Sequence, residues 1–415
     1  MRVTQNMNQM QFIAALTAME SNLSRTQNQI ATNLSFTTPS ENPVAAGAVD
    51  QYNQALSQSK QYDINANSAQ TRLGTEDNAM SQVQTALQSL RTLALQANSG
   101  TLSAQDRAGI ATQATQIQAT LVSLANTQDG HGEYIFGGFA TQTQPFAASP
   151  TGATYGGDSG QRQVQIAAGQ SVADGDNGNT VFNQIKTGNG TFTATAASGN
   201  TGGGVLGATA VTNPAAYDGK PFSIQFALTT APLTGVVTTT YNILDLTGAV
   251  VTPGAPSPGA PYTSGQTISY DGLQVTLSGQ PAAGDTFNVA PSTNQSLFTT
   301  VQNLVTALQT NTATVGANAR LNNSVNAAIN NIDQALQQTS SVRATIGGRL
   351  NSITAQLSTS SSQQIQLQTS ISSLQSLDYA AAITSLDQQN VTLSASMQAY
   401  TLTQGLSLFK YLPSA

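Results

Sequence analysis

The chain has 415 residues, of which only 8% are charged, with 13 Lys and Arg against 19 Asp and Glu and a net charge of −6. It contains no Cys and a single His, which excludes disulfides, thiolate nucleophiles and metal sites built from several His. A sparsely charged acidic chain is a poor match for nucleic acid, and no stretch approaches the roughly 18 apolar residues of a membrane span. At about one domain per 150 residues, the length suggests about three domains.

The pattern of apolar residues predicts helices over the first ~145 residues. Near the N-terminus, the apolar residues recur at alternating steps of four and three, the heptad spacing of a helix that packs on another helix. The members of this N-terminal seam are Phe12, Leu16, Met19, Leu23 and Ile30, with Thr26 on the same face. The apolar run within 12–19 has the length of a signal-peptide core. Because the seam continues to Ile30, we expect no cleaved signal.

Helix-capping residues mark the next two helices. The stretch from Leu34 to Pro43 interrupts the helical pattern, and Asn42 followed by Pro43 is typical of an N-cap and a first helical residue. A second helix is predicted to run to about Ala97. Ser103 with Asp106 three residues later resembles a capping box, which opens a third helix.

The amino-acid composition differs from about residue 147 to 291, a stretch that contains 23 of the 35 Gly. Short alternating runs at 222–226, 267–270 and 273–277 predict strands, and Asp271-Gly272 predicts a tight hairpin turn between the last two. From about residue 294 to the end, the sequence pattern again predicts helices. The predicted fold class is therefore α+β, with a long-helix coiled-coil bundle built from both chain termini and a β-rich central insert domain.

Three domains are expected from these changes. Residues 1–42 plus 376–415 form a terminal coiled-coil domain, residues 43–146 plus 292–375 form a helical bundle domain with a β-hairpin, and residues 147–291 form a β-rich outer domain. Five apolar anchors at roughly 1.5–3 kcal/mol each cannot offset the ordering of ~30 residues at roughly 1.5 kcal/mol each. We therefore expect both termini to be disordered in the monomer and to become helical on assembly.

A second seam is predicted in the last forty residues, again with alternating steps of four and three. Asn390 occupies one of its positions, where a polar residue either fixes register or is simply solvated. The apolar members of this C-terminal seam are Tyr379, Ile383, Leu386, Leu393, Met397 and Tyr400.

We find no motif that predicts catalysis, a cofactor or a metal. His131 lies between two glycines without a nucleophile at a suitable spacing, which favours an exposed turn. The segment from Asp174 to Gly178 faintly resembles a calcium loop but lacks the later acidic ligand. The glycine pairs and triplets lack the spacing of a phosphate-binding loop. We therefore expect no enzyme activity and no cofactor.

Motifs at both ends of the chain resemble the flagellin superfamily. Gln29–Leu34 and Pro39–Ala45 are similar to the family's "Q-L-A-S-G" and "P-S-D-D-P-V-A" stretches, although Asn33 stands where the family usually has Gly; Asn also tolerates left-handed backbone. At the C-terminus, Asp378–Ala380 and Leu406–Leu412 are similar to "D-Y-A" and "L-S-L-F-x-Y-L". The resemblance covers about 140 N-terminal and about 120 C-terminal residues, and not the insert.

One segment resembles hook-associated protein 3 more than filament flagellin. Leu124–Thr127, Gly132–Gly138 and Pro145-Phe146 are similar to "A-N-T", "G-x-Y-L-F-x-G" and "P-F". We expect a strand at Tyr134–Phe136 and a turn at Gly137-Gly138, so that the segment forms a hairpin against the helices. This family-signature hairpin comprises Tyr134, Phe136, Gly137, Pro145 and Phe146.

The resemblance implies a structural protein of the bacterial flagellum. It implies secretion through the flagellar type III export apparatus after binding an export chaperone, and self-assembly into a ring-like layer at the hook–filament junction. The first hook-associated protein would lie on the hook side and flagellin on the filament side, with no nucleic acid or membrane partner. The implied assembly interface is the two seams together with Leu406 and Phe409. The alternatives are a filament flagellin and an adhesin that binds through its β-rich insert.

Overall fold

The computed structural model describes residues 2–99, 102–230, 237–251, 259–310 and 313–405. Two compact units are formed, one from two segments that are distant in sequence and one from a single continuous segment. The first unit comprises the residues up to Ile64 and those from Ala355 onwards. The second unit comprises Asn65–Thr354. The predicted three-domain boundaries are a different division and stay a prediction. No helix in these ranges combines the length and apolar character of a membrane span.

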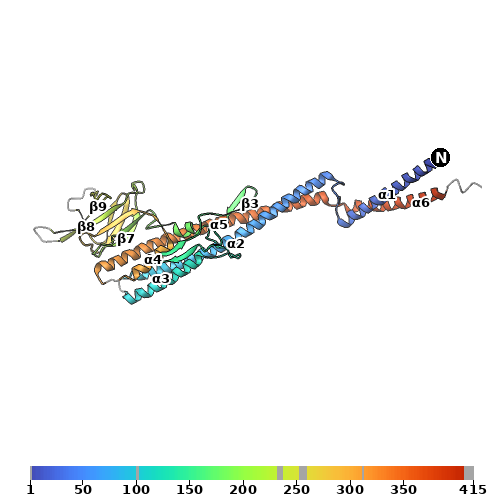
Figure 1. Ribbon diagram of the computed structural model, residues 1–415. Coiled ribbons are helices and arrows are strands. Elements are labelled where there is room, and N and C mark those ends of the chain that lie inside the picture. Colours follow the sequence, from blue (N-terminus) through green and yellow to red (C-terminus); the bar gives the residue numbers. More distant parts are fainter. Residues whose placement is uncertain (1, 100–101, 231–236, 252–258, 311–312, 406–415) are drawn as a thin grey trace, which may run out of the picture. The chain divides into compact units, whose positions relative to one another are not determined.

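Long helices at both ends and a β-rich middle confirm the predicted fold class (Figure 1). The expected caps are present, because Asn42 accepts a hydrogen bond from Ala45 N at 3.1 Å, and Ser103 and Asp106 form the reciprocal capping box. The helices are α1 (Arg2–Thr32), α2 (Pro43–Ala97), α3 (Ala104–Ala125), α4 (Leu297–Leu308), α5 (Val315–Gln375) and α6 (Tyr379–Gly405).

In the first unit, the loop between α1 and α2 folds onto the helices instead of extending into solvent. Asn33 has a left-handed φ of 57°, which supports the expectation that Asn replaces Gly there. The turn brings Ser35 N to 2.7 Å from the Gln375 carbonyl oxygen and buries the Phe36 ring with Val49 and Ile371. Phe36 therefore anchors the connection between the two helices.

Antiparallel strands dominate residues 146–295 of the second unit. A five-stranded sheet has the order β10-β9-β8-β13-β6, a three-stranded sheet the order β11-β12-β7, and three two-stranded pairs are β1-β2, β3-β4 and β14-β5. The strands are β1 (Phe146–Ser149), β2 (Gly152–Tyr155), β3 (Gln163–Ala167), β4 (Gln170–Ala173), β5 (Ile185–Lys186), β6 (Phe192–Ala196), β7 (Val205–Val211), β8 (Phe222–Thr230), β9 (Val237–Leu244), β10 (Ala260–Pro261), β11 (Gln266–Tyr270), β12 (Leu273–Ser278), β13 (Thr286–Pro291) and β14 (Asn294–Gln295).

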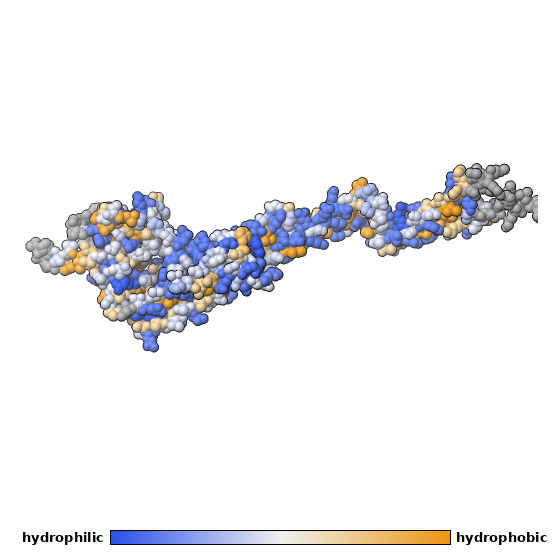
Figure 2. All heavy atoms as spheres, in the orientation of Figure 1, coloured by the Kyte–Doolittle hydropathy of each residue, from blue (hydrophilic) through white to orange (hydrophobic). Residues whose placement is uncertain are grey.

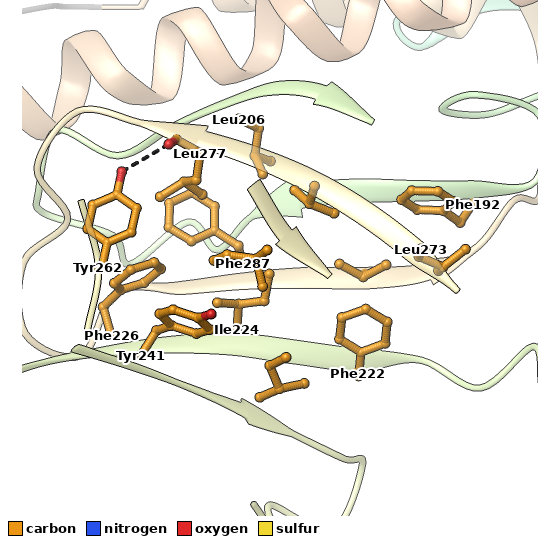
Figure 3. Packing of buried hydrophobic residues seen from close by; sticks show 14 residues of the cluster. Phe192, Leu206, Phe222, Ile224, Phe226, Tyr241, Tyr262, Leu273, Leu277 and Phe287 are labelled. Carbon is orange, nitrogen blue, oxygen red and sulfur yellow. Dashed lines mark hydrogen bonds between the residues drawn. The ribbon is translucent and has the colours of Figure 1, made fainter. Parts of the chain in front are cut away.

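The two larger sheets share one apolar core, rich in aromatic rings (Figure 3). Phe226 packs edge-on against Phe287 and Tyr262, and the buried Tyr262 hydroxyl donates a hydrogen bond to the Leu277 carbonyl oxygen at 3.1 Å. The predicted β11–β12 hairpin is confirmed. Asp271 and Gly272 both have positive φ, 51° and 74°, as a two-residue turn of this kind requires.

Polar side chains of α5 attach this β-rich region to the helices. Asn323 accepts a hydrogen bond from Leu206 N at 2.7 Å and donates to the Gly204 carbonyl oxygen at 3.0 Å. Asn326 donates to the Leu206 carbonyl oxygen at 2.8 Å. One turn earlier, Arg320 donates to the Asn200 carbonyl oxygen at 2.7 Å. The start of β7 is therefore held by side chains that bind its main chain.

Candidate assembly surfaces

The N-terminal seam faces α6. Its predicted apolar members are all partly buried, whereas the residues between them are mostly exposed. Phe12 stacks on Tyr400 with ring centroids 5.0 Å apart and ring planes at 12°, and Gln9 donates a hydrogen bond to the Tyr400 hydroxyl at 3.2 Å. Further along, the Ser396 hydroxyl lies 3.6 Å from the sulfur of Met19. The face of α1 that the heptad spacing marks therefore packs on α6 within the chain, and its role in assembly stays a prediction.

The C-terminal seam is divided between two faces of α6. Leu386, Leu393 and Tyr400 are partly buried on the face that α1 covers. Tyr379, Ile383 and Met397 are instead 52%, 40% and 44% exposed. The residues that complete the buried face are Ala382, Gln389 and Ser396. Four-three spacing therefore spans two adjacent faces of this helix, and the role of these residues in assembly stays a prediction.

We call Tyr379, Ile383 and Met397 the outer stripe. At about 100° per residue, these three lie within about 40° of one another around the α6 axis, beside the buried face. Asn390 falls on the same side and is exposed. On α1, Met7 and Met10 are also exposed, at 52% and 66%. Figure 2 shows apolar residues interspersed with polar ones over this helix pair. Leu406 and Phe409 lie outside the described residues.

The family-signature segment forms turns, so the predicted hairpin at Tyr134–Phe136 is wrong. Tyr134 makes one isolated bridge, with Gln128, and Ile135 N donates to the Thr127 carbonyl oxygen at 3.0 Å. Gly137 and Gly138 begin a further turn, in which Gly138 has a φ of 71°. The Gly137 carbonyl oxygen accepts a hydrogen bond from Asp158 N at 3.2 Å, and Tyr134 N donates to the Thr141 carbonyl oxygen at 2.8 Å. No strand is formed over the described residues 134–138.

The two signature phenylalanines lie in an aromatic cluster between helices and strands. Phe136 and Phe146 are completely buried, and each packs edge-on against Phe182, with centroids 5.1 and 5.4 Å apart. Phe146 also contacts Phe298 of α4 at 5.0 Å. The Pro145 carbonyl oxygen accepts a hydrogen bond from Gly156 N at 2.8 Å. The segment therefore joins β1 and β2 to the helices.

Ion pairs surround the same segment. Arg72 of α2 lies 2.6 Å from Asp129 and 3.4 Å from Glu133. Arg349 of α5 lies 2.9 Å from Asp176, and Arg162 pairs with Asp174 at 2.6 Å.

Glu76, one turn from Arg72, is completely buried. Burial raises the pKa of its carboxyl well above the usual range, and the nearby Asp176 carboxylate raises it further. Sequence reasoning missed this network, because its members are up to 277 positions apart, from Arg72 to Arg349.

The candidate calcium segment is part of this network. Asp174 and Asp176 each face an Arg guanidinium at ion-pair distance, which disfavours a cation between them. In the described ranges, no group of three or more His, Asp or Glu is arranged to hold a metal ion. His131 is exposed in a turn, as expected.

Comparisons with known proteins agree with the motifs at both ends. The model of the bacterial flagellin N-terminal helical region matches residues 3–141, and that of the C-terminal helical region matches residues 329–412. The flagellar hook-associated protein 3 of Salmonella typhimurium is 34% identical over 185 residues, which is 45% of this chain and 58% of that protein. The chain thus spans less than two thirds of the curated relatives that it matches.

Solved structures extend the likeness over most of the fold. The crystal structure of FlgL from Xanthomonas campestris is 33% identical, with a TM-score of 0.69, and the match covers 77% of this chain and 99% of that one. The flagellar junction protein FlgL from Legionella pneumophila is 28% identical, with a TM-score of 0.70, over 79% of this chain and 100% of that one. The chain therefore belongs to the FlgL family, that of hook-associated protein 3, within the flagellin superfamily.

Proposed function

We propose that this chain is a structural subunit of the bacterial flagellum, located outside the cell at the junction between hook and filament. Subunits self-assemble into a ring-like layer, which binds the first hook-associated protein on one side and flagellin on the other. The chain reaches this place through the flagellar type III export apparatus, after binding an export chaperone. Its role is mechanical, without catalysis. Support comes from its family and from its relatives' names.

The observation that carries the proposal is the pair of faces on α6. One face packs on α1, while the outer stripe of Tyr379, Ile383 and Met397 remains exposed. A two-helix contact buries little apolar surface for its length, and helices of this kind gain stability from further packing. Other subunits of the same assembly supply such neighbours. In this proposal the α1–α6 contact forms within a subunit, and the outer stripe forms contacts between subunits.

The first test is deletion of the gene in its host. The proposal predicts hooks without filaments, and flagellin lost to the medium. Intact filaments on the deletion strain would contradict it. The alternative of a filament flagellin predicts a different result in vitro, namely that the purified protein alone polymerises into long filaments.

A second test separates assembly from folding by complementing the deletion strain with point variants. Ile383→Glu places a charge in the outer stripe, and Gln388→Glu places the same charge on an exposed position about 140° away around the helix. Both side chains are exposed in the subunit, so both variants should be secreted and folded. We expect Ile383→Glu to reduce filament number and motility and Gln388→Glu to restore both. Equal motility for the two variants would remove the outer stripe from the assembly interface.

Aromatic residues of the insert bear on the adhesin alternative. It relied on Phe and Tyr side chains of the insert that could stack on sugars. Phe222, Phe226, Tyr241, Tyr262 and Phe287 are all buried in the core between the two larger sheets. A glycan array probed with the full chain tests what remains of this alternative.

A further inference from the structure

Two buried polar atoms of α2 point to a small binding site beside Gly175. Arg72 and Glu76 lie one turn apart and are 6% and 0% exposed. Arg72 Nη1 donates to Asp129 and Glu133, and Nη2 donates to the Tyr134 carbonyl oxygen. Glu76 Oε1 accepts a hydrogen bond from Asp176 N at 3.2 Å. Arg72 Nε and Glu76 Oε2 have no hydrogen-bond partner among the described residues. Orphaned polar atoms this deep in a protein are costly.

Both orphaned atoms lie close to the same point, beside Gly175. A carbon added at Cβ of Gly175 would lie 3.7 Å from Arg72 Nε, 3.7 Å from Glu76 Oε2 and 3.6 Å from the Ile135 carbonyl oxygen. A donor and two acceptors thus converge where residue 175 has no side chain. The convergence involves α2, the signature segment and the loop after β4.

The space available suits one small molecule. A cavity of about 10 Å³ is lined by Arg72, Ile135 and Gly175 among others, and Glu76 adjoins it at Gly175. This volume is at the lower limit of the roughly 10 to 15 Å³ that one water molecule needs. A buried water also needs two to four polar partners, and three are present here. The Arg72 guanidinium disfavours a cation at this point, and the Glu76 carboxyl disfavours an anion. A neutral molecule that both donates and accepts hydrogen bonds is the remaining class.

We propose that this cavity binds a single structural water, which accepts a hydrogen bond from Arg72 Nε and bridges Glu76 Oε2 to the Ile135 carbonyl oxygen. The water satisfies three groups that no side chain reaches. It thereby links α2 to the signature segment, and Gly175 is the residue whose missing side chain leaves room for it.

The test is Gly175→Ala, because the added methyl group has space but cannot form hydrogen bonds. The distances to its neighbours are ordinary van der Waals contacts, and Gly175 has no positive φ that would strain an Ala. Without a bound water, this substitution should raise Tm, as Gly→Ala changes do where the backbone allows them. With the water displaced, we expect Tm to fall by roughly 2–4 °C.

The matched control is Gly199→Ala, which also has no positive φ and nothing within 4 Å of the added carbon. We expect this control to leave Tm unchanged or slightly raised. A Gly175→Ala variant that matches the control would overturn the proposal.

A crystal structure of the full chain at high resolution gives an independent readout. We expect a spherical density peak within hydrogen-bond distance of Arg72 Nε and Glu76 Oε2. The peak should persist in Glu76→Gln, whose amide retains a polar atom at the Oε2 position, and should disappear in Gly175→Ala. Absence of the peak from the native chain, with the two side chains as described, would contradict the proposal whatever the Tm values.

Discussion

The contact of Asn323 with β7 gives the sharpest test of how the β-rich region is held. Asn323 is buried, at 8% exposure, and its side chain pairs with two main-chain groups, Leu206 N and the Gly204 carbonyl oxygen. Asn323→Ala removes both partners at once. Each buried group left unsatisfied costs about 1–3 kcal/mol, while Ala gains about 0.5 kcal/mol in the helix. The expected net loss is about 2–5 kcal/mol.

Hydrogen exchange at the Leu206 amide measures this loss where it occurs. At about 1.4 kcal/mol per tenfold change, protection should fall by roughly 30- to 3,000-fold in Asn323→Ala. Ser324→Ala is the matched control, because it is the next residue of α5, is exposed, and gains similar helix propensity. A loss of less than tenfold in Asn323→Ala, or an equal loss in both variants, would refute this account of the contact.

Three further predictions concern other parts of the chain. Burial and the Asp176 carboxylate raise the pKa of Glu76 in the folded chain. The protonated Glu76 carboxyl therefore contributes stability that is fully present below the unfolded pKa of about 4.3. This stability is lost as the pH rises through the folded pKa. Glu76→Gln should therefore make Tm less dependent on pH above about 4.3, and an unchanged pH profile would refute this. Phe36→Ala should cost about 3–5 kcal/mol, seen as faster proteolysis of residues 33–42, and an unchanged cleavage rate would argue against the anchor. Gly138→Ala should lower Tm, because its φ is 71° and the added carbon would lie within 3.0 Å of Asp158; a higher Tm would show that Asp158 moves freely.

Local patterns predicted local structure well. The Asn42 cap, the capping box at Ser103 and the turn at Asp271-Gly272 each depend on residues within four positions, and all three are present. The N-terminal seam lies on the face of α1 that packs on α6, and its role in assembly stays a prediction. For the two caps and the turn, the energy that selects the conformation comes from neighbours in the sequence.

Predictions failed where distant segments decide the conformation. Tyr134 and Phe136 alternate like strand residues, but the Phe136 carbonyl oxygen accepts a hydrogen bond from Gly178 N, 42 positions later, and no described strand lies beside the segment. The ion pair of Arg349 with Asp176 joins residues 173 positions apart, and no local sequence motif predicts such a pair. On α6, apolar residues occupy more than one face, so their spacing alone does not predict which face packs on α1.

The attachment of β7 to α5 determines which amino-acid substitutions this part of the chain can accept. Arg320, Asn323 and Asn326 bind main-chain atoms of residues 200–206, and every amino acid except Pro offers the same main-chain groups. Substitutions along the attached strand therefore leave these hydrogen bonds available. The β-rich region can thus change in sequence along this strand and keep its attachment to α5, provided that Arg320, Asn323 and Asn326 are retained.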